Sequence, residues 1–253
     1  MRTVRATRYV TPLREGGSVP AIIEADDCGT YVVKFRGAAQ GVRALIAEVI
    51  GGELGRLLGL PVPPLVAIAI DPVLARSEPD PEIQTTLRAS GGLNIGLDYL
   101  PGALNWDPSM PRTDAALAAR IVWFDALISN VDRTARNPNM LRWHKQLYLI
   151  DHGAALYFHH DWPTQQAKAR SPFSPIKHHA LLPVASSIAA ADAELAPSVT
   201  EAALRAILAD VPDDYLGAEA TPAATREAYV AHLLARMAAP RLFAEEAERA
   251  RLV

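Results

Sequence analysis

Two short polar segments hold the residues best able to do chemistry. In the first, Asp132 precedes Asn137 by five positions. In the second, the apolar run 147–150 leads into Asp151, His152 and Gly153. One carboxylate can orient an attacking hydroxyl and accept its proton, while a carboxamide oxygen and a second carboxylate can bind the Mg²⁺ that bridges nucleotide phosphates. Either segment alone is more often an ordinary turn, but the two in this order indicate phosphoryl transfer.

A lysine upstream of these segments supports the same chemistry. Lys34 is the polar residue between Val33 and Phe35 in a strand-like run, and Glu48 follows in a largely apolar helical segment. A strand lysine paired with a helical glutamate can grip the phosphates of a nucleotide. A surface lysine would be the plainer interpretation of Lys34 alone, and its place ahead of the other motifs favours the ion pair. Glu53 is the alternative partner for this lysine.

A phosphate-covering loop has only a slight signature. Gly16, Gly17 and Ser18 separate the first two expected strands, and their backbone N–H groups could bind phosphate. The sequence has no Gly-x-Gly-x-x-Gly pattern here, and an ordinary hairpin turn explains the segment equally well. The three residues are therefore candidates for nucleotide binding.

The first hundred residues, which would position Lys34 and Glu48, are predicted to be mostly strands with one helix. Segments 8–11, 20–24 and 31–35 are rich in β-branched or aromatic residues, which predicts strands. Apolar residues recur at helical spacing in 40–58, and 65–70 is expected to form a strand. Residues 71–90 are polar and hold three prolines, which predicts a loop, and 91–100 is expected to be a strand or a hinge.

The rest of the chain is expected to be mostly helical. A helix is predicted at 113–129, followed by a polar link at 130–139 and a strand at 147–150. Segment 154–185 is rich in proline and histidine, and Thr221-Pro222 is expected to open a long final helix. Segregated strands and helices predict an α+β fold. A strand-rich, nucleotide-binding N-terminal lobe at 1–101 would face a helical, catalytic C-terminal lobe at 102–253.

Composition limits the functions open to a chain of 253 residues with a formal net charge of −3. Basic residues are not in excess, so no nucleic-acid partner is expected. Cys28 is the single cysteine, which excludes an internal disulfide, and we expect a buried or half-buried free thiol. No segment has the roughly 20 apolar residues of a membrane span. The N-terminus lacks the apolar run of a signal peptide, so a cytoplasmic protein is expected.

Together the motifs resemble those of the HipA-like kinase family. The resemblance covers about residues 16–160 and rests on four segments: Tyr31-Val-Val-Lys-Phe35, Glu48 ahead of Leu57-Leu-Gly-Leu-Pro-Val-Pro63, Asn130-Val-Asp-Arg133 with Asn137, and Ile150-Asp-His-Gly153. The Asp-x-x-x-x-Asn spacing equals that of the protein-kinase catalytic loop. Phosphatidylinositol kinases share the Asp-Arg-x-x-x-Asn and Ile-Asp-x-Gly patterns. The resemblance implies a two-lobed, protein-kinase-like fold that uses ATP and Mg²⁺.

The resemblance also implies a role for each candidate residue. Lys34 binds nucleotide phosphates, Asp132 is the catalytic base, and Asn137 and Asp151 hold Mg²⁺. Segment 93–100 would be the hinge that contacts adenine. Within that hinge, Asp98 and Leu100 are the candidate contact residues.

The phosphoryl acceptor stays open at this point. A serine or threonine of a protein is the expected acceptor, and a lipid headgroup or a small metabolite is the alternative. Asn130-Val131 stands where ordinary protein kinases have His-Arg, which favours the HipA-like or lipid-kinase branches. Two further functions are nucleotidyl transfer on a kinase fold and a nucleotide-binding pseudokinase that acts as an interaction module. The presence of Lys34, Asp132 and Asp151 counts against the pseudokinase.

Overall fold

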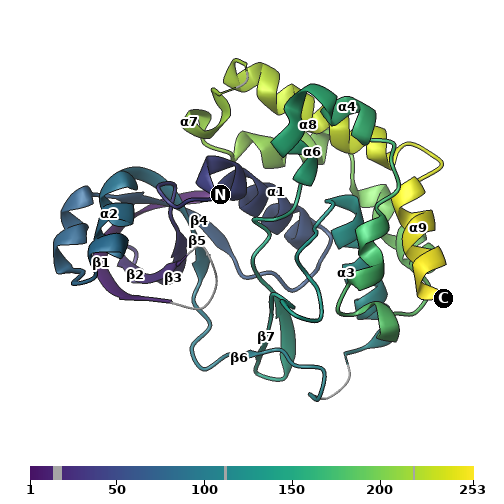
Figure 1. Cartoon of the computed structure of the whole chain (residues 1–253), viewed down its shortest axis with the longest axis horizontal. Coiled ribbons are helices and arrows are strands. Elements are labelled where there is room, and N and C mark those ends of the chain that lie inside the picture. Colours follow the sequence, from purple (N-terminus) through teal and green to yellow (C-terminus); the bar gives the residue numbers. More distant parts are fainter. Residues whose placement is uncertain (14–18, 111–112, 219) are drawn as a thin grey trace.

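The computed structural model describes residues 1–13, 19–110, 113–218 and 220–253. It combines helices and strands, as an α+β chain should. Figure 1 shows a barrel of strands on one side, most of the helices on the other, and helix α1 between them. The candidate loop residues Gly16, Gly17 and Ser18 lie outside the described residues.

Five strands form the barrel: β1 (Arg2–Pro12), β2 (Ala21–Ala25), β3 (Thr30–Lys34), β4 (Leu65–Ile70) and β5 (Gly92–Asp98). Their order is β1-β2-β3-β5-β4, and β1 pairs with β4 in parallel to close the barrel, whereas the other neighbours are antiparallel. Side chains alternate across each strand, so Ile23 and Val33 are completely buried inside. Burying a side chain of this size contributes roughly 1.5–3 kcal/mol.

The connection between β4 and β5 is helical, so the expectation of a loop at 71–90 was wrong. It forms the 3₁₀ helix η1 (Pro72–Ser77) and helix α2 (Pro81–Ala89). Asp71 accepts a hydrogen bond from the Val73 N–H, and Asp80 accepts from the N–H groups of Glu82 and Ile83. Pro72 and Pro81 occupy first-turn positions, where the missing N–H costs nothing. These prolines begin helices instead of breaking them.

Helix α1 (Gly41–Leu57) joins the barrel to the rest of the molecule. Residues 45–52 are buried without a break, because β4 and β5 contact one side of the helix and α6 and α7 contact another. Its apolar residues belong to the larger of two buried clusters, which continues into the helices, while the interior of the barrel forms the second cluster. Helix α1 thereby holds Glu48 at the junction of the two.

Helix α3 (Ala115–Leu127) contacts α5 (Ile188–Leu195) and α9 (Leu242–Arg251). Helices α6 (Glu201–Ala209) and α7 (Asp213–Leu216) contact α8 (Pro222–Met237). Thr221 and Pro222 begin a helix as expected, since the Thr221 side chain caps α8, but α8 is not the final helix. The chain turns at Pro240, which has no N–H to donate, and α9 follows. The shorter helices are α4 (Gln165–Lys168), η2 (Tyr157–Thr164), η3 (Ser174–His178), η4 (Leu182–Val184) and η5 (Ala196–Ser198).

A small three-stranded sheet lies below the barrel in Figure 1 and consists of β6 (Leu104–Asn105), β7 (Met140–Trp143) and β8 (Gln146–Leu149). Only β8 was expected from the sequence. His144 and Lys145 form the β7–β8 turn with φ angles of 46° and 67°. Such a turn usually carries asparagine or glycine, so these residue types gave no hairpin signal.

Two expectations drawn from composition can be compared with the structure, one about Cys28 and one about membrane-spanning segments. Cys28 is exposed in the β2–β3 turn, so a buried or half-buried thiol was the wrong expectation. Among the described residues, no helix has the length and apolar character needed to cross a membrane.

Candidate active site

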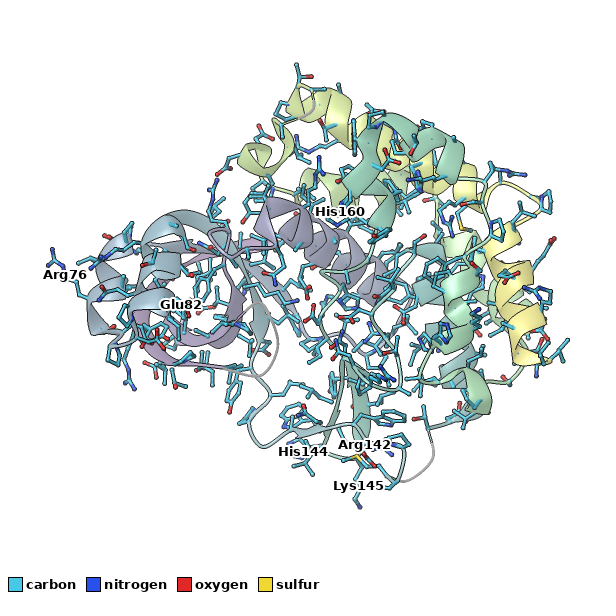
Figure 2. The ribbon with its side chains drawn as sticks, viewed as in Figure 1. Arg76, Glu82, Arg142, His144, Lys145 and His160 are labelled. Atoms are coloured by element: carbon cyan, nitrogen blue, oxygen red, sulfur yellow. The ribbon has the colours of Figure 1, made fainter. Side chains whose placement is uncertain are left out.

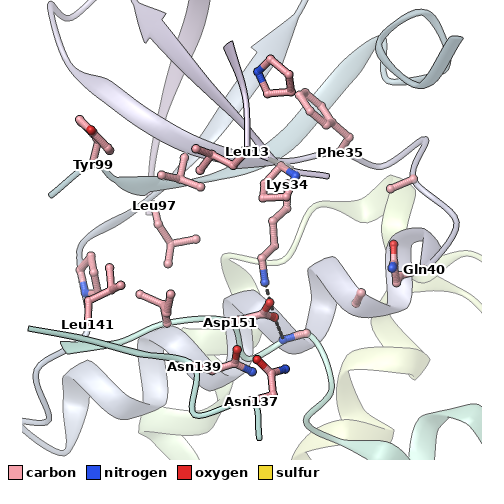
Figure 3. Close-up of a pocket in the computed structure, with 18 of the residues that line it drawn as sticks. Leu13, Lys34, Phe35, Gln40, Leu97, Tyr99, Asn137, Asn139, Leu141 and Asp151 are labelled. Atoms are coloured by element: carbon pink, nitrogen blue, oxygen red, sulfur yellow. Dashed lines mark hydrogen bonds and ion pairs between the residues drawn. The ribbon is translucent and has the colours of Figure 1, made fainter. Parts of the chain in front are cut away.

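Candidate residues from distant parts of the sequence line one cleft of about 1660 Å³. Lys34 comes from β3, Asp132 and Asn137 come from the loop after α3, and Asp151 follows β8. Figure 3 shows Lys34 reaching from the barrel toward Asp151, with Asn137 beside that carboxylate. The fold thus brings Lys34 to three side chains that lie 98, 103 and 117 positions further along the sequence.

Lys34 sits between two carboxylates. Its Nζ atom lies 2.7 Å from Oε2 of Glu48 and 2.5 Å from Oδ1 of Asp151. Burial alone would lower the pKa of Lys34, but the two carboxylates outweigh it and raise that pKa. Burial would raise the pKa of Glu48, but Lys34 and the His152 side chain outweigh burial and lower that pKa to about 2. Lys34 and Glu48 are therefore both charged, and the glutamate fixes the ammonium group in the cleft.

Asp151 is presented by a tight turn at the end of β8. Its φ angle is 55°, a left-handed conformation that aspartate tolerates better than most residues. The Gly153 N–H donates to Oδ1 of Asp151 at 3.3 Å, and the His152 N–H donates to Oε2 of Glu48 at 2.9 Å. The His152 side chain packs so closely on Gly51 of α1 that a Cβ atom there would lie 2.8 Å from it. The turn is thereby anchored on α1 and aims the Asp151 carboxylate into the cleft.

Asp132 is held by amide groups on its own loop. Its Oδ2 atom accepts hydrogen bonds from Nδ2 of Asn137 at 2.8 Å and from Nδ2 of Asn139 at 3.1 Å. Its backbone N–H donates to Oδ1 of Asn130 at 3.1 Å. These contacts occupy one carboxylate oxygen and leave Oδ1 to meet an acceptor hydroxyl. Asn139 is a residue of this site that the sequence argument did not name.

A buried network of charged residues anchors the loop that holds Asp132. Asp125, inside α3, lies 2.6 Å from Nε of Arg133 and 2.9 Å from Nε2 of His179. It also accepts a hydrogen bond from Nδ2 of Asn130 at 2.9 Å. Burial would raise the pKa of Asp125, but Arg133, His179 and Asn130 lower it well below its usual range. The network was not predicted, although an aspartate in the apolar run Phe124-Asp-Ala-Leu127 was a signal of the same kind as Glu48.

The oxygen atoms at this end of the cleft fit a magnesium ion. Mg²⁺ prefers oxygen ligands, keeps several waters and needs only one or two protein groups. Asp151 is 37% exposed, and Asn137 is exposed and donates through its nitrogen, which leaves its Oδ1 as a ligand atom. Among the described residues, no three or more His, Cys, Asp or Glu side chains gather as a metal site. An aspartate with an asparagine is therefore the donor set that this chain offers.

The same cleft is also lined by the end of β5 and by apolar side chains. Asp98 and Leu100 both line it. The N–H of Tyr99 donates to the Thr30 carbonyl at 3.0 Å, which fixes the segment beside β3. The apolar lining includes Leu13, Val32, Leu97, Met140 and Ile150. Apolar walls with a few polar groups are typical of small-molecule sites.

The alternative partner for Lys34 lies elsewhere. Glu53 is 3.7 Å from Nε of Arg56, one turn along the same helix. Lys34 instead pairs with Glu48, whose Oε2 atom lies 2.7 Å from the lysine Nζ atom. Glu48 is therefore the glutamate that the fold places against Lys34.

Two comparisons with known proteins found similarity to this chain. The model of the HipA-like kinase family matches residues 7–246. The crystal structure of a proinflammatory kinase from Helicobacter pylori, CtkA, superposes with a TM-score of 0.60 and 12% identity, covering 97% of this chain and 96% of that chain. At this identity the similarity concerns the fold alone. No curated protein sequence matches the chain.

Proposed function

The chain belongs to the HipA-like kinase family, and from that premise we propose that it is an ATP-dependent kinase that transfers the γ-phosphoryl group to a hydroxyl acceptor. One observation carries the proposal: Lys34 is ion-paired with buried Glu48 in the same cleft as Asp132, Asn137 and Asp151. A phosphate-binding cation, a base and an oxygen-rich metal site are the parts that phosphoryl transfer needs.

Each residue has one task in this proposal. Lys34 neutralises the ATP phosphates, and Glu48 holds it in place. Asn137 and Asp151 would hold Mg²⁺, which would neutralise charge on the phosphate oxygens. The acceptor oxygen attacks the γ-phosphorus, the bond to the β,γ-bridging oxygen breaks, and ADP leaves. Oδ1 of Asp132 takes the hydroxyl proton, because its Oδ2 already accepts from Asn137 and Asn139.

We further propose that the two parts of the molecule act as kinase lobes. The barrel within residues 1–101 would bind the nucleotide, and residues 102–253 would supply the catalytic loop and the metal ligands. The separate buried cluster inside the barrel supports this division. Asp98 and Leu100 would contact adenine where the chain passes from one part to the other.

The acceptor that we propose is a serine or threonine hydroxyl of a protein. This choice follows the family resemblance. A lipid headgroup or a metabolite hydroxyl would use the same base and the same nucleotide site. The acceptor therefore has to be identified by experiment.

The test uses the whole chain, Mg-ATP and intact-protein mass spectrometry, with a generic protein substrate and ADP detection alongside. We expect ADP to form and a phosphate to appear on the substrate or on the chain itself, and EDTA to abolish both. Addition of an adenylate, which is much heavier than a phosphate, would instead assign nucleotidyl transfer. Tight Mg-ATP binding with no product would assign the pseudokinase function and overturn the proposal.

A further inference from the structure

We propose that Asn139 is a positioning residue that fixes the Asp132 carboxylate for proton transfer. The inference rests on the proposed function, because it assigns a second holder to the proposed catalytic base. The kinase motif spacing does not include an asparagine at this position, and the proposed metal site does not use one. The inference comes instead from the contacts that Asn139 makes in the fold.

The side chain of Asn139 has a single hydrogen-bonded target among the described residues. Nδ2 donates to Oδ2 of Asp132 at 3.1 Å, the same oxygen that accepts from Asn137 at 2.8 Å. Two donors on one oxygen fix the rotation of the carboxylate group, since turning it would break both bonds. Oδ1 is thereby kept on the side that faces the cleft.

The backbone carbonyl of Asn139 is bonded outside its own loop, whereas, among the described residues, the backbone of Asn137 bonds only to Thr134 of the same loop. The Asn139 carbonyl accepts from the N–H of Ile150 at 3.0 Å and from the guanidinium group of Arg133. Arg133 is in turn paired with Asp125 inside the protein. Asn139 therefore connects Asp132 to the buried network and to the strand end that delivers Asp151.

The two asparagines have different surroundings, and this separates their tasks. Asn137 is exposed and is a proposed metal ligand, so its side chain has a second task besides Asp132. Asn139 is half buried, and its carbonyl accepts from both Ile150 and Arg133. Its side chain can therefore serve Asp132 alone.

Only a few residue types suit this position. The φ angle of Asn139 is 46°, a left-handed conformation that asparagine and glycine adopt readily. An aspartate would fit the backbone but would place a negative charge against Asp132. Asparagine combines the required backbone conformation with a neutral N–H donor.

The first test replaces Asn139 with glycine, which keeps the backbone conformation and removes the donor. His144→Gly is the matched control, because His144 also has a φ angle of 46°. It lies at the exposed β7–β8 turn (Figure 2), away from the cleft lining. We expect Asn139→Gly to bind Mg-ATP within about three-fold of wild type and to lose roughly 10- to 100-fold in kcat, as displaced catalytic groups do. His144→Gly should retain both values.

A double-mutant cycle separates positioning from a general structural role. Residues that act as one unit are non-additive, so Asn139→Gly should cause no further loss of the residual activity of Asp132→Ala. A further ten-fold loss in that background would mean that Asn139 acts on something other than Asp132. Wild-type kcat in Asn139→Gly, together with an inactive Asp132→Ala, would overturn this inference and leave the proposed function standing.

A second readout does not depend on turnover. The side-chain amide signals of Asn139 in a nitrogen-15 NMR spectrum should shift in Asp132→Ala, because the hydrogen bond is lost. They should stay in place in Asp26→Ala, which removes an exposed carboxylate that binds Arg5 on the barrel. Unchanged Asn139 signals in Asp132→Ala would exclude the hydrogen bond, whether or not the protein is a kinase.

Discussion

At the scale of single residues, the two carboxylates around Lys34 differ in exposure. Glu48 is completely buried, whereas the Asp151 side chain is 37% exposed. A buried carboxylate is costly to separate from its cation, so Glu48 stays on Lys34. Separating Asp151 from Lys34 costs less, because water reaches Asp151. In the proposed function, Glu48 would therefore stay on the lysine and Asp151 would exchange the lysine for the metal ion.

Replacing Lys34 with methionine should remove productive use of ATP and also destabilise the protein. The buried Glu48 loses its cation, and breaking a buried pair costs about 3 kcal/mol or more in the free energy of unfolding. Lys34→Met/Glu48→Gln should regain most of that stability, measured by urea unfolding, but no phosphotransfer. Normal phosphotransfer by the folded double variant would contradict the role of Lys34.

Replacing Asp151 with asparagine should uncouple ATP binding from magnesium. In the wild type, ATP is expected to raise the melting temperature much more with Mg²⁺ than with EDTA, because the bound complex stabilises the folded state. In Asp151→Asn the two shifts should be equal. Asp26→Asn is the control on the barrel surface and should behave as wild type. A magnesium-dependent shift that survives in Asp151→Asn would place the metal elsewhere.

The sequence could indicate some of these residues but not others. Asp132, Asn137 and Asp151 have a short, ordered spacing that can be recognised along the chain. Asn139 and the Asp125–Arg133–His179 network cannot be found this way, because their roles depend on contacts with residues that come close only in the folded protein. The Asp125–His179 contact, for example, joins residues 54 positions apart.

At the scale of elements, the segment from η2 to α4 packs on α8 through buried histidines. Nδ1 of His159 lies 3.1 Å from the Tyr229 hydroxyl, and Nδ1 of His232 lies 2.8 Å from the Gln165 carbonyl. Burial lowers the pKa of both histidines from 6.5 to about 3, with help from nearby cations such as Arg43 and Arg236. Both are therefore neutral in the folded protein at neutral pH.

The packing of this segment should weaken in acid. A histidine whose folded pKa is lowered stabilises the fold above its unfolded pKa of 6.5, and that stability is lost as the pH falls toward 3. Between pH 7 and pH 5, each histidine should cost about 2 kcal/mol in the free energy of unfolding. His232→Gln should therefore flatten the pH dependence measured by urea unfolding, whereas the exposed His144→Gln should not. Equal slopes in wild type and His232→Gln would contradict the assignment.

The elements were predictable where hydrophobic periodicity sets them. The helix expected at 40–58 is α1, and the strand expected at 65–70 is β4. The helix α2 was missed because its prolines stand at the start of helices, where proline is favoured, and the sequence alone does not place that start. Strand β7 was missed because it is short and depends on pairing with β8.

At the scale of the whole molecule, polar contacts join the barrel to the helices. The N-terminal ammonium group of Met1 lies 2.6 Å from Asp210 at the end of α6. The Tyr215 hydroxyl of α7 donates to the Leu93 carbonyl of β5 at 2.7 Å, and Arg36 pairs with Asp214 at 2.7 Å. These contacts fix the barrel against α6 and α7. Closure of the barrel by the parallel β1–β4 pair could not be expected, because it joins strands some sixty positions apart.

The most direct test of the account compares nucleotide binding with phosphotransfer in Asp132→Asn. A group that acts only on the acceptor hydroxyl contributes to the transition state and little to nucleotide binding. We therefore predict that Asp132→Asn binds Mg-ATP with a Kd within a few-fold of wild type and loses phosphotransfer by about 100-fold or more, as expected for a general base. A folded variant that no longer binds Mg-ATP would make Asp132 a metal ligand or structural residue, and unchanged phosphotransfer would contradict its role as the catalytic base.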